Sequence, residues 1–240
     1  MKLSKRLETV ASMVTKGNRA ADVGCDHGFV PIFLVESGIS PLAVAAGWGS
    51  RQKALSRAKE HIKEHRLEEK IQTRLSNGLA NIKPGEADSL IMSGIGGILM
   101  MRLLQDEEHT AKSFKELILS PQSELFDVRR YLVSNGYLIE YEHMLCDEGK
   151  YYFIFHVLVK KDEREWSEEE YRYGKDICKD DMKTFLAYLE KEERQYEQIL
   201  EKMKQAPEND RAAQRIAQLH QDITCLKKRR QLVYDCGCFA

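Results

Sequence analysis

The sequence predicts an α/β fold: a seven-strand, mainly parallel sheet with an antiparallel edge hairpin, followed by a C-terminal α-helical hairpin. Three observations predict it. Short apolar runs alternate with amphipathic helical stretches up to about residue 161. Two apolar runs, 137–145 and 151–159, are separated only by the turn "CDEGK". After about residue 167 the chain is highly charged, with helical spacing. Alternating strands and helices build parallel sheets, and a closing hairpin adds antiparallel strands.

The individual elements follow from periodicity and from Pro and Gly at their ends. Pro31 suits the first turn of one helix and Gly38 its end, while Gly136 closes another. The other five strands are expected at 19–23, 42–47, 71–78, 89–97 and 115–121, and the helices between them at 3–14, 31–38, 54–66, 100–105 and 125–136. Ligands of such sheets bind beyond the carboxyl ends of the strands.

The change in character after the last strand predicts two domains, residues 1–161 and residues 162–240. Two apolar stripes in the second domain, separated by "APEND", predict two helices that pack as an antiparallel, coiled pair. A basic run at 227–230 is expected to be solvated, and contact with a phosphate is the alternative.

Composition excludes some classes of protein. The chain has 240 residues, 42% hydrophobic and 31% charged, as expected for a globular cytoplasmic protein. It has neither an apolar run of membrane-spanning length nor the apolar core of a signal peptide, so we expect no membrane association. The net charge of −1 means that a nucleic acid would need a local basic patch. We expect a monomer or a weak dimer.

The six cysteines are scattered and form no CxxC pair. Free thiols are the expectation in a reducing cytosol, and we predict no metal site. A metal site at Cys236 and Cys238 is the alternative.

The turn after the first strand carries the strongest signal for a ligand. A dinucleotide site uses G-x-G-x-x-G there, because pyrophosphate needs bare backbone and the positive end of a helix. This turn instead places Asp22, Cys25 and Asp26 near the ligand, beside Gly24 and Gly28. Carboxylates suit a ligand with an ammonium group, such as S-adenosylmethionine (SAM). The pattern D-x-G-x-x-x-G is typical of the Rossmann-like class I methyltransferases. A tight turn without a ligand is the alternative.

Two further turns lie at the same edge of the predicted sheet. Asn77 and Gly78 follow the third strand, where the adenine end of SAM passes, and an ordinary Asn-Gly turn is the alternative. The glycine-rich stretch 93–97 ends the fourth strand and would leave space beside the sulfonium for the methyl acceptor. A loop that needs positive φ is the alternative there.

Polar groups after the fifth strand and in the last hairpin could meet the acceptor. Pro121 and Gln122 lie at the end of the fifth strand. Lys150 could reach a phosphate, and an aromatic ring such as Tyr152 could stack on a base. Roles as turn and core residues are the alternative for all of these.

Seven stretches of the chain occur in an order that resembles the bacterial TrmK-type enzymes. They are "LSKRLETVASMV", "DVGCDHGFVPIFL", "RLSNGL", "SGIGG", "LSPQSELFDVRRYL", "EGKYY" and "EEEYRYGK". The resemblance covers nearly the whole chain. It implies a SAM-dependent enzyme that methylates N1 of adenine 22 in tRNA, with a C-terminal coiled coil that helps to engage the tRNA.

The resemblance and the local patterns described above together assign roles to individual residues. The cofactor would be bound by Asp22, Gly24, Cys25, Asp26, His27, Gly28, Trp48, Asn77, Gly78, Leu79, Ser93 and Gly94. The substrate would be bound by Gly96, Gly97, Pro121, Gln122, Lys150 and Tyr152. We expect Asp26 to act in catalysis by stabilising the positive charge that develops on the methylated base.

The second strand departs from the family pattern. Class I methyltransferases have an acidic residue there for the ribose hydroxyls, whereas residues 46–51 of this chain contain none. Trp48 would stack against the cofactor instead. Two alternatives therefore stay open: a SAM methyltransferase with another substrate, and an RNA-binding protein of this fold that has lost the cofactor. An NAD(P)-binding protein is disfavoured, because G-x-G-x-x-G is missing.

Overall fold

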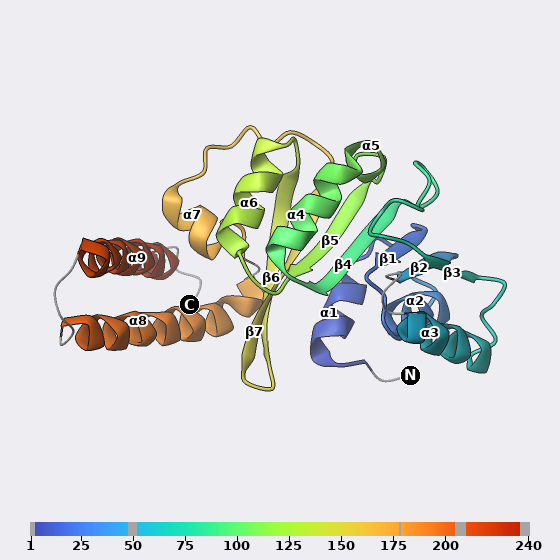
Figure 1. The fold of residues 1–240 in the computed structure, drawn as a ribbon, viewed down its shortest axis with the longest axis horizontal. Helices are drawn as coiled ribbons and strands as arrows, with labels where there is room; N and C mark the ends of the chain where they lie inside the picture. Colours follow the sequence, from blue (N-terminus) through green and yellow to red (C-terminus); the bar gives the residue numbers. More distant parts are fainter. Residues whose placement is uncertain (1–2, 48–51, 178, 205–209, 236–240) are drawn as a thin grey trace.

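The computed structural model describes residues 3–47, 52–177, 179–204 and 210–235, and its centre is a seven-stranded sheet (Figure 1). The strand order is β3-β2-β1-β4-β5-β7-β6. The strands are β1 (Ala20–Val23), β2 (Ala43–Gly47), β3 (Ile71–Leu75), β4 (Ser89–Ile95), β5 (Glu116–Pro121), β6 (Leu138–Asp147) and β7 (Lys150–Leu158).

The sheet has the predicted mixture of strand directions. β1 pairs in parallel with both β2 and β4, so the strand order reverses between β1 and β4. β7 pairs antiparallel with β5 and with β6. The predicted fold class is therefore confirmed, and the reversal beside β1 marks the edge where a ligand is expected.

Helices cover both faces of the sheet and bury its apolar side chains (Figure 1). Helices α1 (Lys5–Ser12), α2 (Phe29–Glu36) and α3 (Gln52–Glu64) lie on one face, and α4 (Gly97–Asp106), α5 (Glu108–Ala111) and α6 (Leu125–Ser134) on the other. Ile32 and Leu34 of α2 are fully buried on the first face, as are Met100 and Leu104 of α4 on the second. The short helix α5 was not predicted.

The C-terminal part differs from the predicted pair of helices. Helix α7 (Glu168–Tyr173) is separate and is followed by the 3₁₀ turn η2 (Lys179–Asp181), α8 (Met182–Lys204) and α9 (Asp210–Asp235). Gly174 ends α7 with a φ of +92°, and a Cβ there would lie 2.7 Å from Ile177 Cδ1. A continuous helix from residue 167 is therefore excluded by the backbone at this glycine.

A buried arginine, Arg129, connects the sheet to the first of the C-terminal helices. The guanidinium of Arg129 on α6 donates to Glu142 of β6 at 2.7 Å, and both side chains are fully buried. The same guanidinium donates to the carbonyls of Tyr171 and Arg172 in α7, at 3.1 and 3.0 Å. Phe185 of α8 belongs to the same buried cluster as the sheet. The domain boundary at 161/162 and the coiled-coil geometry stay predictions.

Candidate active site

The turn after β1 shapes the carboxyl edge of the sheet. Gly24 has a φ of +90°, and its amide and that of Cys25 donate to the carbonyl of Ala46 in β2, at 3.0 and 3.1 Å. Gly28 has a φ of +74° and precedes α2, and no side chain caps this helix. The backbone conformation that only glycine adopts easily therefore lies at both ends of the turn.

A cavity of about 200 Å³ lies at this turn and brings together seven of the residues predicted to bind the cofactor. These seven are Asp22, Gly24, Cys25, Asp26, His27, Gly28 and Ser93. Arg6, Leu7, Phe29 and Val30 complete the lining. The cavity thus sits at the ends of β1 and β4, where the strand order reverses.

Asp22 is a buried carboxylate with no counter-ion in the described part of the chain. Its exposed fraction is 8%, and burial raises its pKa to about 6. A hydrogen bond from the Cys25 thiol opposes the shift only in part. Burial and the neighbouring Asp22 also raise the pKa of Cys25, so this thiol stays protonated. A cation that reached Asp22 would relieve the cost of burying its charge.

Arg6 is a site residue that the sequence did not assign. Its guanidinium donates to the hydroxyl of Ser93 at 2.5 Å and lies 5.4 Å from the ring centroid of Tyr152. Its backbone N–H donates to Asp147 at 3.5 Å. Arg6 therefore joins α1, the end of β4 and the last hairpin. Arg6 could not be assigned from the sequence, because a single arginine on an amphipathic helix forms no motif and its partner Ser93 is 87 positions away.

Asp26 and His27 lie in the more open part of this cavity. The side chain of Asp26 is 48% exposed, and its carboxylate lies 3.5 Å from His27 Nε2. The imidazole rings of His27 and His61 each stack on Phe29, at centroid distances of 5.1 and 5.2 Å. The carboxylate predicted to act in catalysis is thus accessible to a substrate.

The residues after β3 do not line this cavity. Asn77 is exposed, whereas Leu79 is fully buried in the hydrophobic core. A Cβ on Gly78 would lie 2.4 Å from Leu103 Cδ2, so packing against α4 explains this glycine. The side chain of Leu79 packs inward, so contact of Leu79 with the cofactor stays a prediction that its backbone would have to meet. Trp48, predicted to stack on the cofactor, lies outside the described residues.

Packing explains part of the need for glycine between the end of β4 and the start of α4. Gly94 has a φ of +82°, and a Cβ there would lie 3.7 Å from the guanidinium of Arg6. A Cβ on Gly96 would lie 3.2 Å from Ser123 Oγ, and one on Gly97 would lie 2.5 Å from the Ser123 carbonyl oxygen. Contact of Gly96 and Gly97 with a base stays a prediction, since close packing on the loop after β5 already requires a small residue at Gly97.

A second cavity, of about 370 Å³, brings together the other predicted substrate residues. It lies between the end of β5, the β6–β7 hairpin and α8, and we call it the α8 groove. Its lining includes Pro121, Gln122, Lys150 and Tyr152, as well as Tyr151, Tyr188, Lys191, Glu192 and Gln195. The residues of α8 were not predicted, because nothing in a helical stripe shows which strand it meets.

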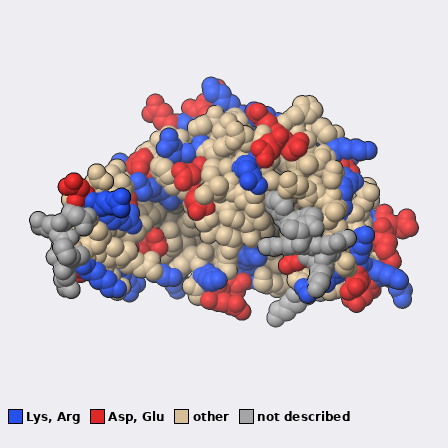
Figure 2. All heavy atoms as spheres, viewed as in Figure 1, with Lys and Arg blue, Asp and Glu red and all other residues tan. Residues whose placement is uncertain are grey.

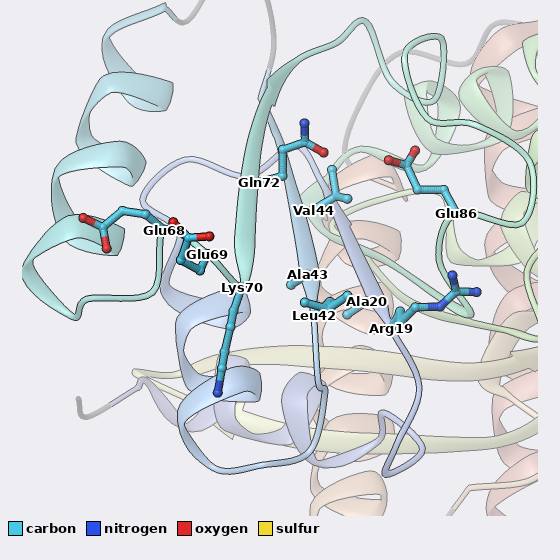
Figure 3. Close-up of a pocket in the computed structure, with 10 residues that line it drawn as sticks. All are labelled: Arg19, Ala20, Leu42, Ala43, Val44, Glu68, Glu69, Lys70, Gln72 and Glu86. Atoms are coloured by element: carbon cyan, nitrogen blue, oxygen red, sulfur yellow. The ribbon is translucent and has the colours of Figure 1, made fainter.

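A third cavity, of about 440 Å³, lies at the amino ends of β1 and β2 (Figure 3). Figure 3 shows Arg19 and Glu86 on one side of it and Glu68 and Glu69 on the other. The Arg19 guanidinium pairs with Asp88 at 2.9 Å, and Glu86 pairs with Arg74 at 2.6 Å. Because these charges are already paired, and ligands of parallel sheets bind at the opposite end, we assign no ligand here.

The described part of the chain has free thiols, but no cluster of metal ligands and no helix that could span a membrane. No group of three His, Cys, Asp or Glu side chains there could hold a metal ion. Cys25, Cys146 and Cys225 are free thiols, and the cysteines of the alternative metal site, Cys236 and Cys238, lie outside the described residues. None of the described helices combines the length and the apolar character that a membrane span requires.

Comparison with known protein families identifies the family of this chain. A methyltransferase domain model matches residues 3–155, which include every strand up to β7. The chain belongs to the methyltransferase family. The matched residues include all those that line the cavity at β1 and β4, and those that the β6–β7 hairpin contributes to the α8 groove.

The methyltransferase is similar along nearly its whole length to several known proteins. It is 28% identical to the tRNA (adenine(22)-N(1))-methyltransferase of Bacillus subtilis, over 95% of this chain and 97% of that protein. The structure of TrmK from M. capricolum with S-adenosyl-homocysteine is 25% identical, with a TM-score of 0.83, and covers 97% of this chain and 100% of that one. Sp1610 of Streptococcus pneumoniae with S-adenosyl-L-methionine is 30% identical, with a TM-score of 0.82, over 95% and 100% of the two chains.

Proposed function

We propose that this methyltransferase transfers the methyl group of SAM to N1 of adenine 22 in tRNA. The observation that supports it is the cavity at β1 and β4, which is lined by a buried carboxylate, Asp22, that forms no ion pair with the described residues, and by the guanidinium of Arg6. The substrate is inferred from the Bacillus subtilis relative, which matches nearly the whole chain.

The residues of the cavity fit the amino-acid end of SAM. Asp22 has no ion-pair partner among the described residues, and its raised pKa is what an ammonium group would lower again. Arg6 supplies the opposite charge in the same cavity and is suited to a carboxylate. The positive φ at position 24 favours glycine, and because glycine has no side chain, none blocks the ligand at this turn. When bound, SAM supplies an electrophilic methyl group on its sulfonium.

The protein contributes mainly binding and orientation. N1 of neutral adenine has a lone pair, so no base is needed to activate it. The methylated base is cationic, and Asp26 at the open part of the cavity would stabilise that charge. Holding the base and the methyl donor in line provides the rest of the acceleration. The substrate also implies a cytoplasmic location, and a monomer or weak dimer remains our expectation.

Methyl transfer to two tRNA transcripts tests this proposal. One transcript is unmodified and the other has guanine in place of adenine 22, and both are incubated with SAM that carries a labelled methyl group. We expect label only in the first, at N1 of adenine 22, by mass spectrometry. Equal incorporation into both would overturn the site assignment. Calorimetry without binding at millimolar SAM would favour the alternative of a non-catalytic RNA-binding protein.

A further inference from the structure

The α8 groove combines cationic and aromatic side chains from segments far apart in the sequence. The ammonium group of Lys191 on α8 lies 5.1 Å from the ring centroid of Tyr151 on β7. The ring of Tyr188 lies 5.4 Å from that of Tyr151 and holds it in place. An ammonium beside an aromatic face offers contacts for a phosphate and a base together.

The cations of the groove are free of ion pairs in the described part of the chain, unlike those of α9. In the basic run of α9, Lys227 and Arg230 pair with Glu193, and Lys228 pairs with Glu169. Lys150 and Lys191 have no such carboxylate partner among the described residues. Glu192, the carboxylate that lines the groove, accepts a hydrogen bond from the Tyr196 hydroxyl at 3.2 Å. The groove therefore has unneutralised positive charge for an anion.

The face of the molecule seen in Figure 2 has no large basic patch that would compete for an anion. Lys and Arg side chains are mixed with Asp and Glu over the face seen in Figure 2, and no side of that view is uniformly basic. With a net charge of −1, the molecule has no general attraction for RNA. Binding of a nucleic acid must then depend on local sites such as this groove.

The groove is next to the cofactor cavity. Tyr152 connects the two: it lines the groove, and its ring centroid lies 5.4 Å from the guanidinium of Arg6, which lines the cavity at β1 and β4. On the neighbouring strand, the amide of Gln122 donates to the carbonyl of Ile95 just after the end of the cavity at Ser93. A group in the groove would therefore be a close neighbour of the group being methylated.

We propose that the α8 groove binds the nucleotide that flanks the target adenine in the RNA. Its phosphate would contact Lys150 and Lys191, and its base would lie against Tyr151. This rests on the proposed function, because the occupant is a segment of the substrate with its bases unstacked. The groove would thus hold the RNA strand while the target base turns into the cavity.

Charge-neutral variants of two lysines on α8 test this inference. Lys191→Gln removes the groove ammonium, and Lys202→Gln removes an exposed one eleven residues along the helix, roughly 16 Å away. Dissociation constants for an unmodified tRNA transcript are measured by fluorescence anisotropy at several salt concentrations. We expect Lys191→Gln to weaken binding about fivefold to tenfold and to reduce the salt slope by about one. Lys202→Gln should stay within about twofold.

Tyr151→Leu separates stacking from charge. It keeps an apolar side chain beside Tyr188 but removes the aromatic face, and Tyr151→Phe is the matched control that keeps it. We expect Tyr151→Leu to weaken RNA binding about fivefold with an unchanged salt slope, since stacking of a base on an aromatic ring contributes to affinity without a change in charge. Calorimetry with SAM should give the wild-type affinity for all four variants, which shows that they are folded.

The outcomes distinguish this inference from the proposed function. Equal weakening by Lys191→Gln and Lys202→Gln, or no weakening by Lys191→Gln, would overturn the groove site. If the wild type methylates adenine 22 while Lys191→Gln binds tRNA normally, only the groove inference fails. If the wild type transfers no methyl group to adenine 22 but RNA binding still depends on Lys191 and not on Lys202, the groove inference stands and the proposed reaction fails.

Discussion

The two ends of the sheet each bury a carboxylate, and they treat it in opposite ways. Asp22 at the carboxyl end of β1 has a pKa raised to about 6 by burial. Glu116 at the amino end of β5 is also buried, yet its pKa is lowered to about 2 by its hydrogen-bond partners. The groups within 3.1 Å of the Glu116 carboxylate belong to Thr15, Asn18, Ser89 and His156.

The two carboxylates differ in whether the protein itself supplies the groups that stabilise their charge. Around Glu116 the protein itself supplies the donors, so the charge contributes to the stability of the fold. Around Asp22 the cation is missing from the described part of the chain, so the charge is held at a cost in stability that a ligand can relieve. Five experiments would break or sharpen this comparison.

Glu116→Gln should give the largest effect, a loss of about 3 kcal/mol in the free energy of unfolding. The amide keeps one acceptor oxygen but replaces the other with a donating NH₂ group, so the donors on that side lose their acceptor and the charge is lost as well. Urea denaturation measures the loss, and calorimetry should find the affinity for SAM within about twofold of the wild type. A loss below about 1 kcal/mol would mean that the network contributes little to the fold.

Asp22→Asn should weaken SAM binding by about tenfold to a hundredfold without destabilising the protein. A hydrogen bond to a charged group contributes about 1.5–3 kcal/mol, and the neutral amide cannot supply it to an ammonium. The free energy of unfolding should stay the same or rise, because a buried charge is removed. Asp26→Asn is the matched control, with a smaller loss of affinity. Loss of stability in Asp22→Asn would contradict the contrast with Glu116.

Affinity for SAM should rise about tenfold between pH 5 and pH 7. Asp22 binds an ammonium only when ionised, and with a pKa of about 6 it is mostly protonated at pH 5. Calorimetry at both pH values measures the change, and Asp22→Asn should abolish it. A flat profile in the wild type would exclude Asp22 as the partner of the ammonium.

The stability of the fold should depend on pH in opposite directions for the two carboxylates. Because the pKa of Asp22 is raised above its ordinary value of 3.8, its contribution is present below that value and is lost as pH rises through about 6. Because the pKa of Glu116 is lowered from 4.5, its contribution is present above 4.5 and is lost as pH falls toward about 2. Urea denaturation of Asp22→Asn and Glu116→Gln across pH should each remove one of these slopes.

Asp26→Ala should give the smallest effect, a decrease in kcat of about twofold to fivefold. Its carboxylate is 48% exposed, and solvent screens its interaction with the charge on the methylated base. Single-turnover rates with saturating SAM and tRNA measure the change. Unchanged turnover together with unchanged SAM affinity would remove Asp26 from the proposed mechanism.

Most of the fold could be predicted from the sequence because local signals agreed. All seven strands were expected near their observed ranges, and the turn at Gly24 and Gly28 was recognised from two glycines that both have positive φ. The separation of α7 from α8 was missed, since the close contact that fixes Gly174 is with Ile177 and Glu142. Such a contact leaves no local pattern.

Residues that are close in sequence were correctly expected to lie together, whereas contacts between distant residues were not foreseen. Seven predicted cofactor residues share one cavity, and six of them belong to a single turn. Arg6 was missed because its partner Ser93 is 87 positions away. The burial of the Leu79 side chain could not be predicted, because an apolar residue beside a loop can face either the ligand or the core, and only packing against the neighbouring helix decides which.

The sequence by itself determined the class of fold, the edge of the sheet that binds a ligand, and the acidic character of the first turn. These depend on periodicity, strand direction and neighbouring residues, which are local properties. Only the tertiary structure decided that Arg6 faces the same cavity as Asp22, and that Lys191 meets Tyr151 beside it. Both pairings depend on how helices dock on the sheet, and docking is fixed by the shape of the whole core.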